Sequence, residues 1–156
     1  MKQTILLVGF FILASVALSG CDINGDYGSG FTSGDYDIGD ARTGITVKFH
    51  TEEQLDISWF VNAWDRVQAC TGLSVSKGPH IVVVEDLNRG TAAGVTYEYD
   101  RIIVVELAEI LRLERTTILE HEMIHYLLFS LGVDTSLNVN HEYEMFGVCA
   151  PLNTWS

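Results

Sequence analysis

Apolar positions along this chain of 156 residues fall into short segments with different periods. Alternation of apolar and polar residues predicts a half-buried strand over 44–49, and a run of β-branched residues predicts a central strand over 80–87. Two further apolar segments, 93–99 and 101–106, are separated only by Asp100 and read as a hairpin that turns through Asp100-Arg101. These segments together predict a small β-sheet.

Two other segments have the period of a helix. The first follows a capping box at 51–54, with Thr51 expected as the N-cap, and we expect it to end at Gly72. Its apolar positions recur every four residues and predict an amphipathic helix of about five turns, formed around Leu55, Trp59, Ala63 and Val67. The second follows a capping box at 117–120, ends at Gly132 and is apolar on most sides, which indicates a buried helix. We therefore expect an α+β fold, in which a small mixed sheet carries one backing helix and one buried helix.

The composition narrows the possible activities. Asp and Glu residues number 21 against 9 Lys and Arg residues, which gives a formal net charge of −12. This charge repels phosphate groups, so it excludes a nucleic-acid groove or a basic membrane-binding face as the main activity. The chain also has no repeat at a fixed period, which excludes solenoid folds.

The first 20 residues have the pattern of an export signal. Lys2 precedes an apolar run over 5–18, which is shorter than the roughly 20 residues that a membrane-spanning helix needs. The run ends in Leu18-Ser19-Gly20-Cys21, which resembles the lipobox of bacterial lipoproteins. The resemblance implies that residues 1–20 are removed and that Cys21 is acylated. The alternative is an ordinary signal with a free cysteine beside the cleavage site.

The segment after the lipobox is rich in glycine and poor in apolar residues. Residues 21–44 gain too little from burial to offset the entropy of ordering, so they predict a flexible tether with a span of roughly 25 Å. The folded domain is then expected over 45–156. By its resemblance to lipoproteins, the protein is anchored by its lipid in the bacterial cell envelope, on the periplasmic or cell-surface side. Asp22 resembles the inner-membrane retention signal of some Gram-negative bacteria.

Two cysteines remain in the expected domain, Cys70 and Cys149. In an exported protein, an isolated pair is most simply a disulfide. It would close a loop of about 80 residues and stabilise the fold by about 4 kcal/mol, according to the chain-entropy model. The alternative is a pair of buried free thiols.

The buried helix carries an HExxH pattern, His121-Glu122-Met123-Ile124-His125. Residues four apart on a helix share a face, so both imidazoles can bind one metal, while the glutamate can reach a water on that metal. The alternative, two core histidines satisfied by hydrogen bonds, leaves the cost of burying these polar groups unexplained. The pattern resembles that of the zincin metallopeptidases, and the order of elements extends the resemblance to most of 45–150. It implies a compact zincin-like fold, Zn²⁺ bound by His121 and His125, and Glu122 as the general base of peptide hydrolysis.

A third ligand has to come from further along the chain. The metzincin extension would place its glycine and third histidine at Leu128 and Leu131, which excludes that subclass. His141 lies 16 residues after the second histidine, and the segment resembles SprT-like proteins, which take their third ligand shortly after the active helix. Glu142 or Glu144 would instead make the site similar to that of gluzincins.

The leading hypothesis is therefore a tethered zinc metallopeptidase whose partners are a peptide or protein substrate and the membrane, with no nucleic acid. Zincins commonly hold their substrate as an added strand, and the strand at 93–99 is the candidate edge. Tyr126 and Tyr143 are candidate donors to the oxyanion, while His50 and His80 are expected to be ordinary histidines. The alternatives are a zinc-binding lipoprotein that scaffolds a complex without proteolysis, and a structural lipoprotein without metal.

Overall fold

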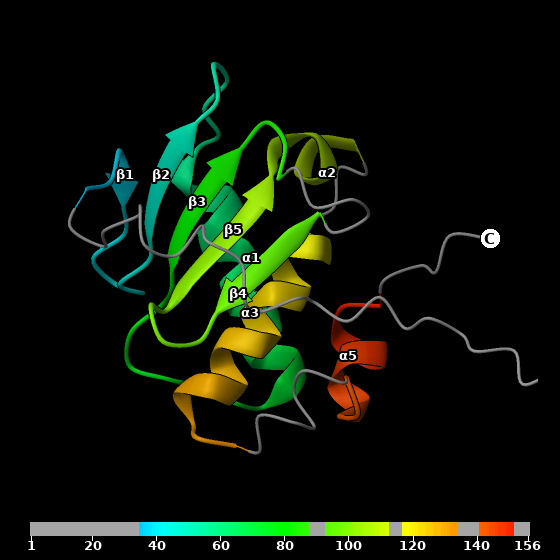
Figure 1. Ribbon diagram of the computed structural model, residues 1–156. Helices are drawn as coiled ribbons and strands as arrows, with labels where there is room; N and C mark the ends of the chain where they lie inside the picture. The colour runs from blue at the N-terminus through cyan, green and yellow to red at the C-terminus, as the bar shows by residue number, and fades with distance from the viewer. Residues whose placement is uncertain (1–34, 88–92, 113–116, 134–140, 152–156) are drawn as a thin grey trace, which may run out of the picture.

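The computed structural model describes four parts of the chain, which are residues 35–87, 93–112, 117–133 and 141–151 (Figure 1). The export signal, Cys21, Asp22 and the first part of the tether lie outside the described residues, so the expectations about them remain predictions. Among the described residues, no helix is both long enough and apolar enough to cross a membrane.

Within the described residues, five strands form one mixed sheet in the order β1-β2-β3-β5-β4 (Figure 1). They are β1 (Ile38–Gly39), β2 (Thr46–His50), β3 (His80–Val84), β4 (Gly94–Tyr97) and β5 (Ile102–Glu106). The three central strands β2, β3 and β5 run parallel, whereas β1 and β4 are each antiparallel to their neighbour. The hairpin predicted through Asp100-Arg101 is confirmed, because the N–H of Arg101 donates to the carbonyl of Tyr97 at 2.9 Å.

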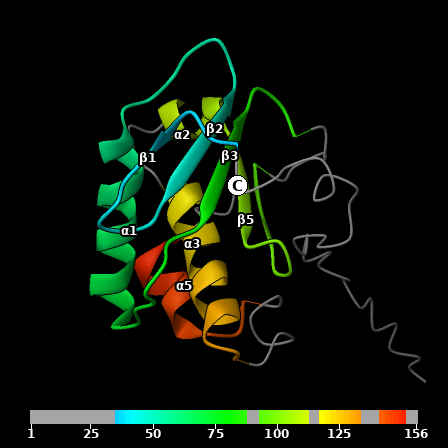
Figure 2. The same ribbon diagram turned by 90° about the vertical axis from the view of Figure 1, so that its left-hand side faces the viewer.

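Four helices among the described residues lie on one face of this sheet (Figure 2). They are α1 (Ile57–Thr71), α2 (Leu107–Arg112), α3 (Thr117–Ser130) and α5 (Glu144–Cys149). Side chains alternate along each strand, so Ile81 and Val83 of β3 join the core beneath the helices, while Val82 and Val84 join a second apolar cluster. The α+β class predicted from the sequence is confirmed.

The first helix begins later than the sequence predicts. Its N-cap is Asp56, whose carboxylate accepts a hydrogen bond from the N–H of Ser58 at 2.8 Å. The hydroxyl of Thr51 instead donates to the carbonyl of Glu53 at 2.6 Å, so the capping box at 51–54 forms a local turn. Aspartate is at least as good an N-cap as threonine, and the later start lets Leu55 enter the core just before the helix. The predicted end at Gly72 is confirmed by its φ of 68°.

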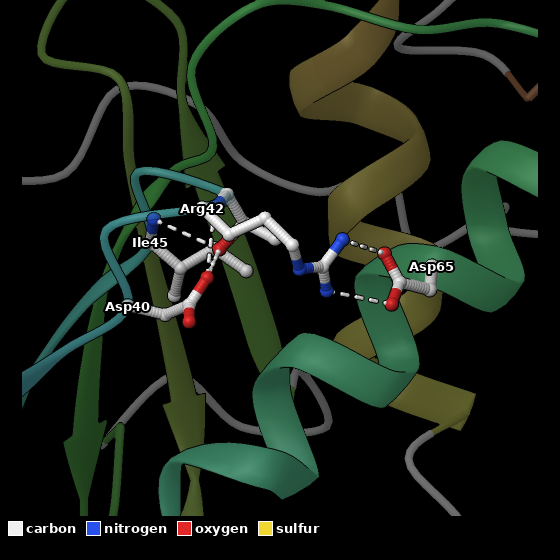
Figure 3. Close-up of polar contacts among 5 residues, drawn as sticks. Asp40, Arg42, Ile45 and Asp65 are labelled. Atoms are coloured by element: carbon white, nitrogen blue, oxygen red, sulfur yellow. Dashed lines mark hydrogen bonds and ion pairs between the residues drawn. The ribbon is translucent and has the colours of Figure 1, made fainter.

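The last ten residues of the predicted tether, 35–44, belong to the folded domain. They contain β1, which pairs with β2. Two interactions order the loop that follows. Asp40 accepts two hydrogen bonds from Thr43, each of 2.7 Å. The guanidinium of Arg42 forms an ion pair with the carboxylate of Asp65 on α1, with N–O distances of 3.2 and 2.8 Å (Figure 3). The expected boundary at 45 is therefore too late, since strand pairing and hydrogen bonds order a segment that has few apolar residues.

The ends of α3 agree with the sequence. The helix starts at Thr117, and Gly132 ends it with a φ of 69°. There the N–H of Gly132 donates to Phe129 and that of Val133 to Leu128, which is the Schellman arrangement. The sequence did not predict α2 and α5, because helices of six residues are too short to show a period.

The disulfide between Cys70 and Cys149 is confirmed, with Cα atoms 5.7 Å apart and the two cysteines separated by 79 positions in sequence. It joins the last turn of α1 to the last residue of α5. The alternative of two free thiols is excluded. A structural disulfide of this kind is typical of a protein that folds in an oxidising compartment.

Candidate metal centre

Three histidines from two parts of the chain meet below the sheet. His121 and His125 lie one turn apart on α3, and His141 comes to them from just before α5. The Nε2 atom of His141 lies 3.1 Å from Nε2 of His121 and 3.0 Å from Nε2 of His125. Glu142 and Glu144, the other candidates for the third ligand, are exposed and are not part of this group.

The spacing of the three nitrogens suits one small cation. All the candidate ligand atoms lie within 4.8 Å of one another. In a tetrahedral zinc site with Zn–N bonds near 2.1 Å, the ligand nitrogens are about 3.4 Å apart. The observed separations of 3.0 and 3.1 Å are close to that value. The histidine group has the size and the donor atoms of a site for one metal ion.

The electrostatics of the rings agree with the geometry. Burial lowers the pKa of His121 to about 3, and positive charge on His125 or His141 would lower it further. Burial also lowers the pKa of His141. Both rings are therefore neutral at pH 7 and can offer a lone pair. Neutral imidazoles whose Nε2 atoms point at one another repel through these lone pairs, and a cation between them removes that repulsion.

The backbone of His141 is in an unusual conformation. Its φ of 56° lies in the left-handed region, which non-glycine residues rarely adopt. Such conformations cost about 1–3 kcal/mol and persist where the surrounding structure imposes them, often at functional sites. Here the conformation places the imidazole between the two rings of α3.

Aromatic side chains enclose the histidine group. The ring of Phe146, on α5, lies with its centroid 5.0, 4.6 and 4.9 Å from those of His121, His125 and His141. Phe129, four residues later on α3, stacks on His125 with the two ring centroids 6.3 Å apart. The sequence offered no signal for Phe146, because α5 has no detectable period and its position depends on tertiary contacts.

The side chain of Glu122 reaches the edge strand β4. Its side chain is buried, and Oε2 accepts a hydrogen bond from the hydroxyl of Thr96 at 2.7 Å. Burial raises the pKa of Glu122 to about 7, although the hydrogen bond from Thr96 opposes this shift. Gly94 leaves the room that the carboxylate needs, because a Cβ at that position would lie 2.9 Å from Cγ of Glu122.

Gly94 and Thr96 were not singled out from the sequence. A signal for them does exist, since they alternate with Val95 and Tyr97 on the hairpin strand and therefore share a face. Val95 and Tyr97 join the apolar cluster on the opposite face of the sheet. The small and polar residues of β4 are consequently the ones that meet α3.

The remaining candidates lie elsewhere. The hydroxyl of Tyr126 donates to the carbonyls of Lys77 and Gly78 at 3.0 and 3.2 Å, so it is engaged away from the histidines and does not serve as an oxyanion donor. Tyr143 is the half-buried N-cap of α5. The two histidines expected to be ordinary are also outside the group: His50 is exposed, and Nδ1 of His80 lies 2.7 Å from the hydroxyl of Thr46 inside the sheet.

Comparison of the chain with protein-family models, with curated proteins and with solved structures gave no match.

Proposed function

We propose that the protein is a zinc metallopeptidase with a compact zincin-like fold, in which His121, His125 and His141 bind the ion. The observation that carries this proposal is the convergence of the three Nε2 atoms, supplied by an HExxH helix and a later residue. Three protein ligands are the number that catalytic zinc sites use, since they leave one position of the tetrahedron open. A bound zinc ion supplies an acidic water and polarises a carbonyl oxygen.

Glu122 is the general base of this proposal. A carboxyl group with a pKa of about 7 can take up a proton near neutral pH and return it to a leaving amine. Its position directly after His121 on α3 places it next to the histidines, while the contact with Thr96 fixes its side chain. The chain therefore holds a proton acceptor at a defined place beside the candidate zinc site.

The edge strand β4 is the proposed binding site for the substrate backbone. It is the last strand of the described sheet, and its Thr96 contacts Glu122. An extended peptide can add to such an edge through main-chain hydrogen bonds. A cavity of about 250 Å³ at the end of β4 has walls that include Thr96, Tyr97 and Phe129. It is the proposed site for a substrate side chain, because Thr96 contacts Glu122 and Phe129 stacks on His125.

We place this activity outside the cytoplasm, on a protein anchored by a lipid at Cys21. The supporting observations are the export signal and lipobox in the sequence and the disulfide in the domain. Retention in the inner membrane through Asp22 belongs to the same proposal.

One alternative is favoured by the contacts of Glu122. A protonated Glu122 that stays hydrogen-bonded to Thr96 would be a structural group, and the protein would then be a zinc-binding envelope module without proteolytic activity. A peptide-library assay on zinc-loaded protein separates the two functions, because only the peptidase cleaves peptides and loses this activity in Glu122→Gln.

The metal site is tested on the full chain purified in detergent, by elemental analysis of bound zinc. We expect about one zinc per chain in the wild type, and loss of the zinc from His121→Ala and from His141→Ala with the fold retained. His50→Ala is the control, because this exposed histidine lies outside the group. Zinc content that is unchanged in both folded variants, or absent from the wild type, would contradict the proposal.

A further inference from the structure

We propose that α5 sets the metal affinity of the histidine site, because the Cys70–Cys149 disulfide holds it against α1 and thereby keeps Phe146 on the three imidazoles. Phe146 is in this view a positioning residue for the ligands. The inference rests on the proposed metal site and adds a part of the fold that lies outside the HExxH helix.

The helix α5 has little stability of its own. It contains six residues, whereas isolated helices shorter than about 12 residues are marginal in water. Its N-cap Tyr143 makes no side-chain capping bond, and Phe146 is its one buried residue. Its position is therefore determined by contacts with other elements, and it packs on both α1 and α3.

Phe146 connects α5 to every candidate ligand. Its ring centroid lies 4.6–5.0 Å from those of the three histidines, at interplanar angles of 45–77°. A ring that touches all three imidazoles limits their rotation about the side-chain bonds. Ligands that are already oriented lose less entropy when a metal binds, so this contact favours binding.

A second contact comes from the residue after α5. The backbone of Ala150, which is fully buried, lies next to His121. The Nδ1 atom of His121 is buried and has no hydrogen-bond partner among the described residues. Groups behind the non-ligating nitrogen of a metal-bound histidine orient the ring, and their loss typically weakens metal binding 10–100-fold.

The disulfide is the covalent link of this arrangement. Cys149 is the last residue of α5 and directly precedes Ala150, while Cys70 lies in the last turn of α1. Both Phe146 and Ala150 are thus within three residues of the cross-link. His141, which precedes α5 by three residues, depends on the same anchor for its place beside α3.

The test is the zinc dissociation constant of the full chain in detergent, measured by competition with a chromophoric chelator. We expect Phe146→Ala to weaken binding about 10-fold or more, and the double variant Cys70→Ser with Cys149→Ser to weaken it to a similar degree. Phe146→Leu keeps part of the apolar contact and should lie between wild type and Phe146→Ala. Cobalt-loaded protein gives a second readout, since the visible spectrum of tetrahedral Co²⁺ reports the ligand geometry.

Phe60→Leu is the matched control. Phe60 is fully buried on α1 and its ring contact is with Phe49 at 6.1 Å, so this variant loses core packing without touching the histidines. It should keep the wild-type zinc affinity and cobalt spectrum. If the folded Phe146 variants keep the wild-type zinc affinity and cobalt spectrum, this inference is wrong but the proposed metal site stands. If the wild type binds no zinc, the proposed function itself is wrong.

Discussion

The hydroxyl of Thr96 on the edge strand β4 lies 2.7 Å from Oε2 of Glu122 on α3, and both groups are buried. The same hydroxyl lies 2.9 Å from the backbone carbonyl of Glu122. A single side chain therefore fixes the carboxylate and ties β4 to α3. The role proposed for Glu122 as a general base depends on this geometry.

Replacement of the Thr96 hydroxyl should separate catalysis from metal binding. Thr96→Val keeps the shape but leaves the buried carboxylate without its donor, so we expect a loss of about 1–3 kcal/mol in the free energy of unfolding. Peptidase activity should fall while zinc content stays the same, because Thr96 is not one of the three candidate ligands. Thr96→Ser keeps the donor and should restore most of the activity. Equal activities of the two variants would show that the hydroxyl does not position Glu122.

Gly94 should tolerate no side chain. A Cβ there would lie 2.9 Å from Cγ of Glu122 and 2.9 Å from Cγ2 of Ile118, so Gly94→Ala should destabilise the fold by about 1–3 kcal/mol in urea unfolding. Gly147→Ala is the control, because a Cβ at this helical position meets nothing within 4 Å. It should be neutral or stabilising by up to about 1 kcal/mol. A loss of stability in Gly147→Ala equal to that in Gly94→Ala would contradict the explanation by steric contact.

The buried carboxylate should make stability depend on pH in the metal-free protein. The pKa of Glu122 is about 7 in the folded state, against an ordinary value of 4.5. The raised pKa therefore contributes to the stability of the folded state. This contribution is fully present below pH 4.5, where the carboxyl group is protonated in both states, and it is lost as the pH rises through 7. Glu122→Gln stays neutral, so it should gain stability relative to the wild type between pH 4.5 and 7, by up to about 3 kcal/mol.

Urea unfolding of both proteins at several pH values, in the presence of a chelator, measures this difference. The histidines are common to both proteins, so their titration largely cancels. A difference in stability that does not change between pH 4.5 and 8 would show that the carboxyl group titrates normally in the fold.

The two candidate caps of α1 should differ in their effect on stability. Asp56→Ala removes the hydrogen bond to the N–H of Ser58 and should cost about 1 kcal/mol in the free energy of unfolding. Thr51→Ala removes only a bond within an exposed turn and should cost less than about 0.5 kcal/mol. The reverse order in thermal or urea unfolding would indicate that the helix starts at the first cap.

Local patterns predicted a large part of this fold. The periods of the apolar residues predicted the central strands, the hairpin and the two long helices, and Gly72 and Gly132 marked where the helices end. The predicted start of α1 was wrong because Thr51 and Asp56 both have the chemistry of a cap, and the packing of Leu55 selects between them. The tether boundary was wrong because 35–44 is ordered by pairing with β2 and by the contact of Arg42 with Asp65.

The sequence by itself determined which polar groups α3 carries on neighbouring positions, since the identity and helical spacing of His121, Glu122 and His125 follow from their order along the chain. The tertiary structure decided between His141 and its acidic neighbours as the third member of the group. It also decided that Thr96 meets Glu122, and that Phe146 covers the three histidines. The physical reason is that a helix fixes distances only over a few residues, whereas groups 20 or more positions apart meet through strand order, the disulfide and core packing.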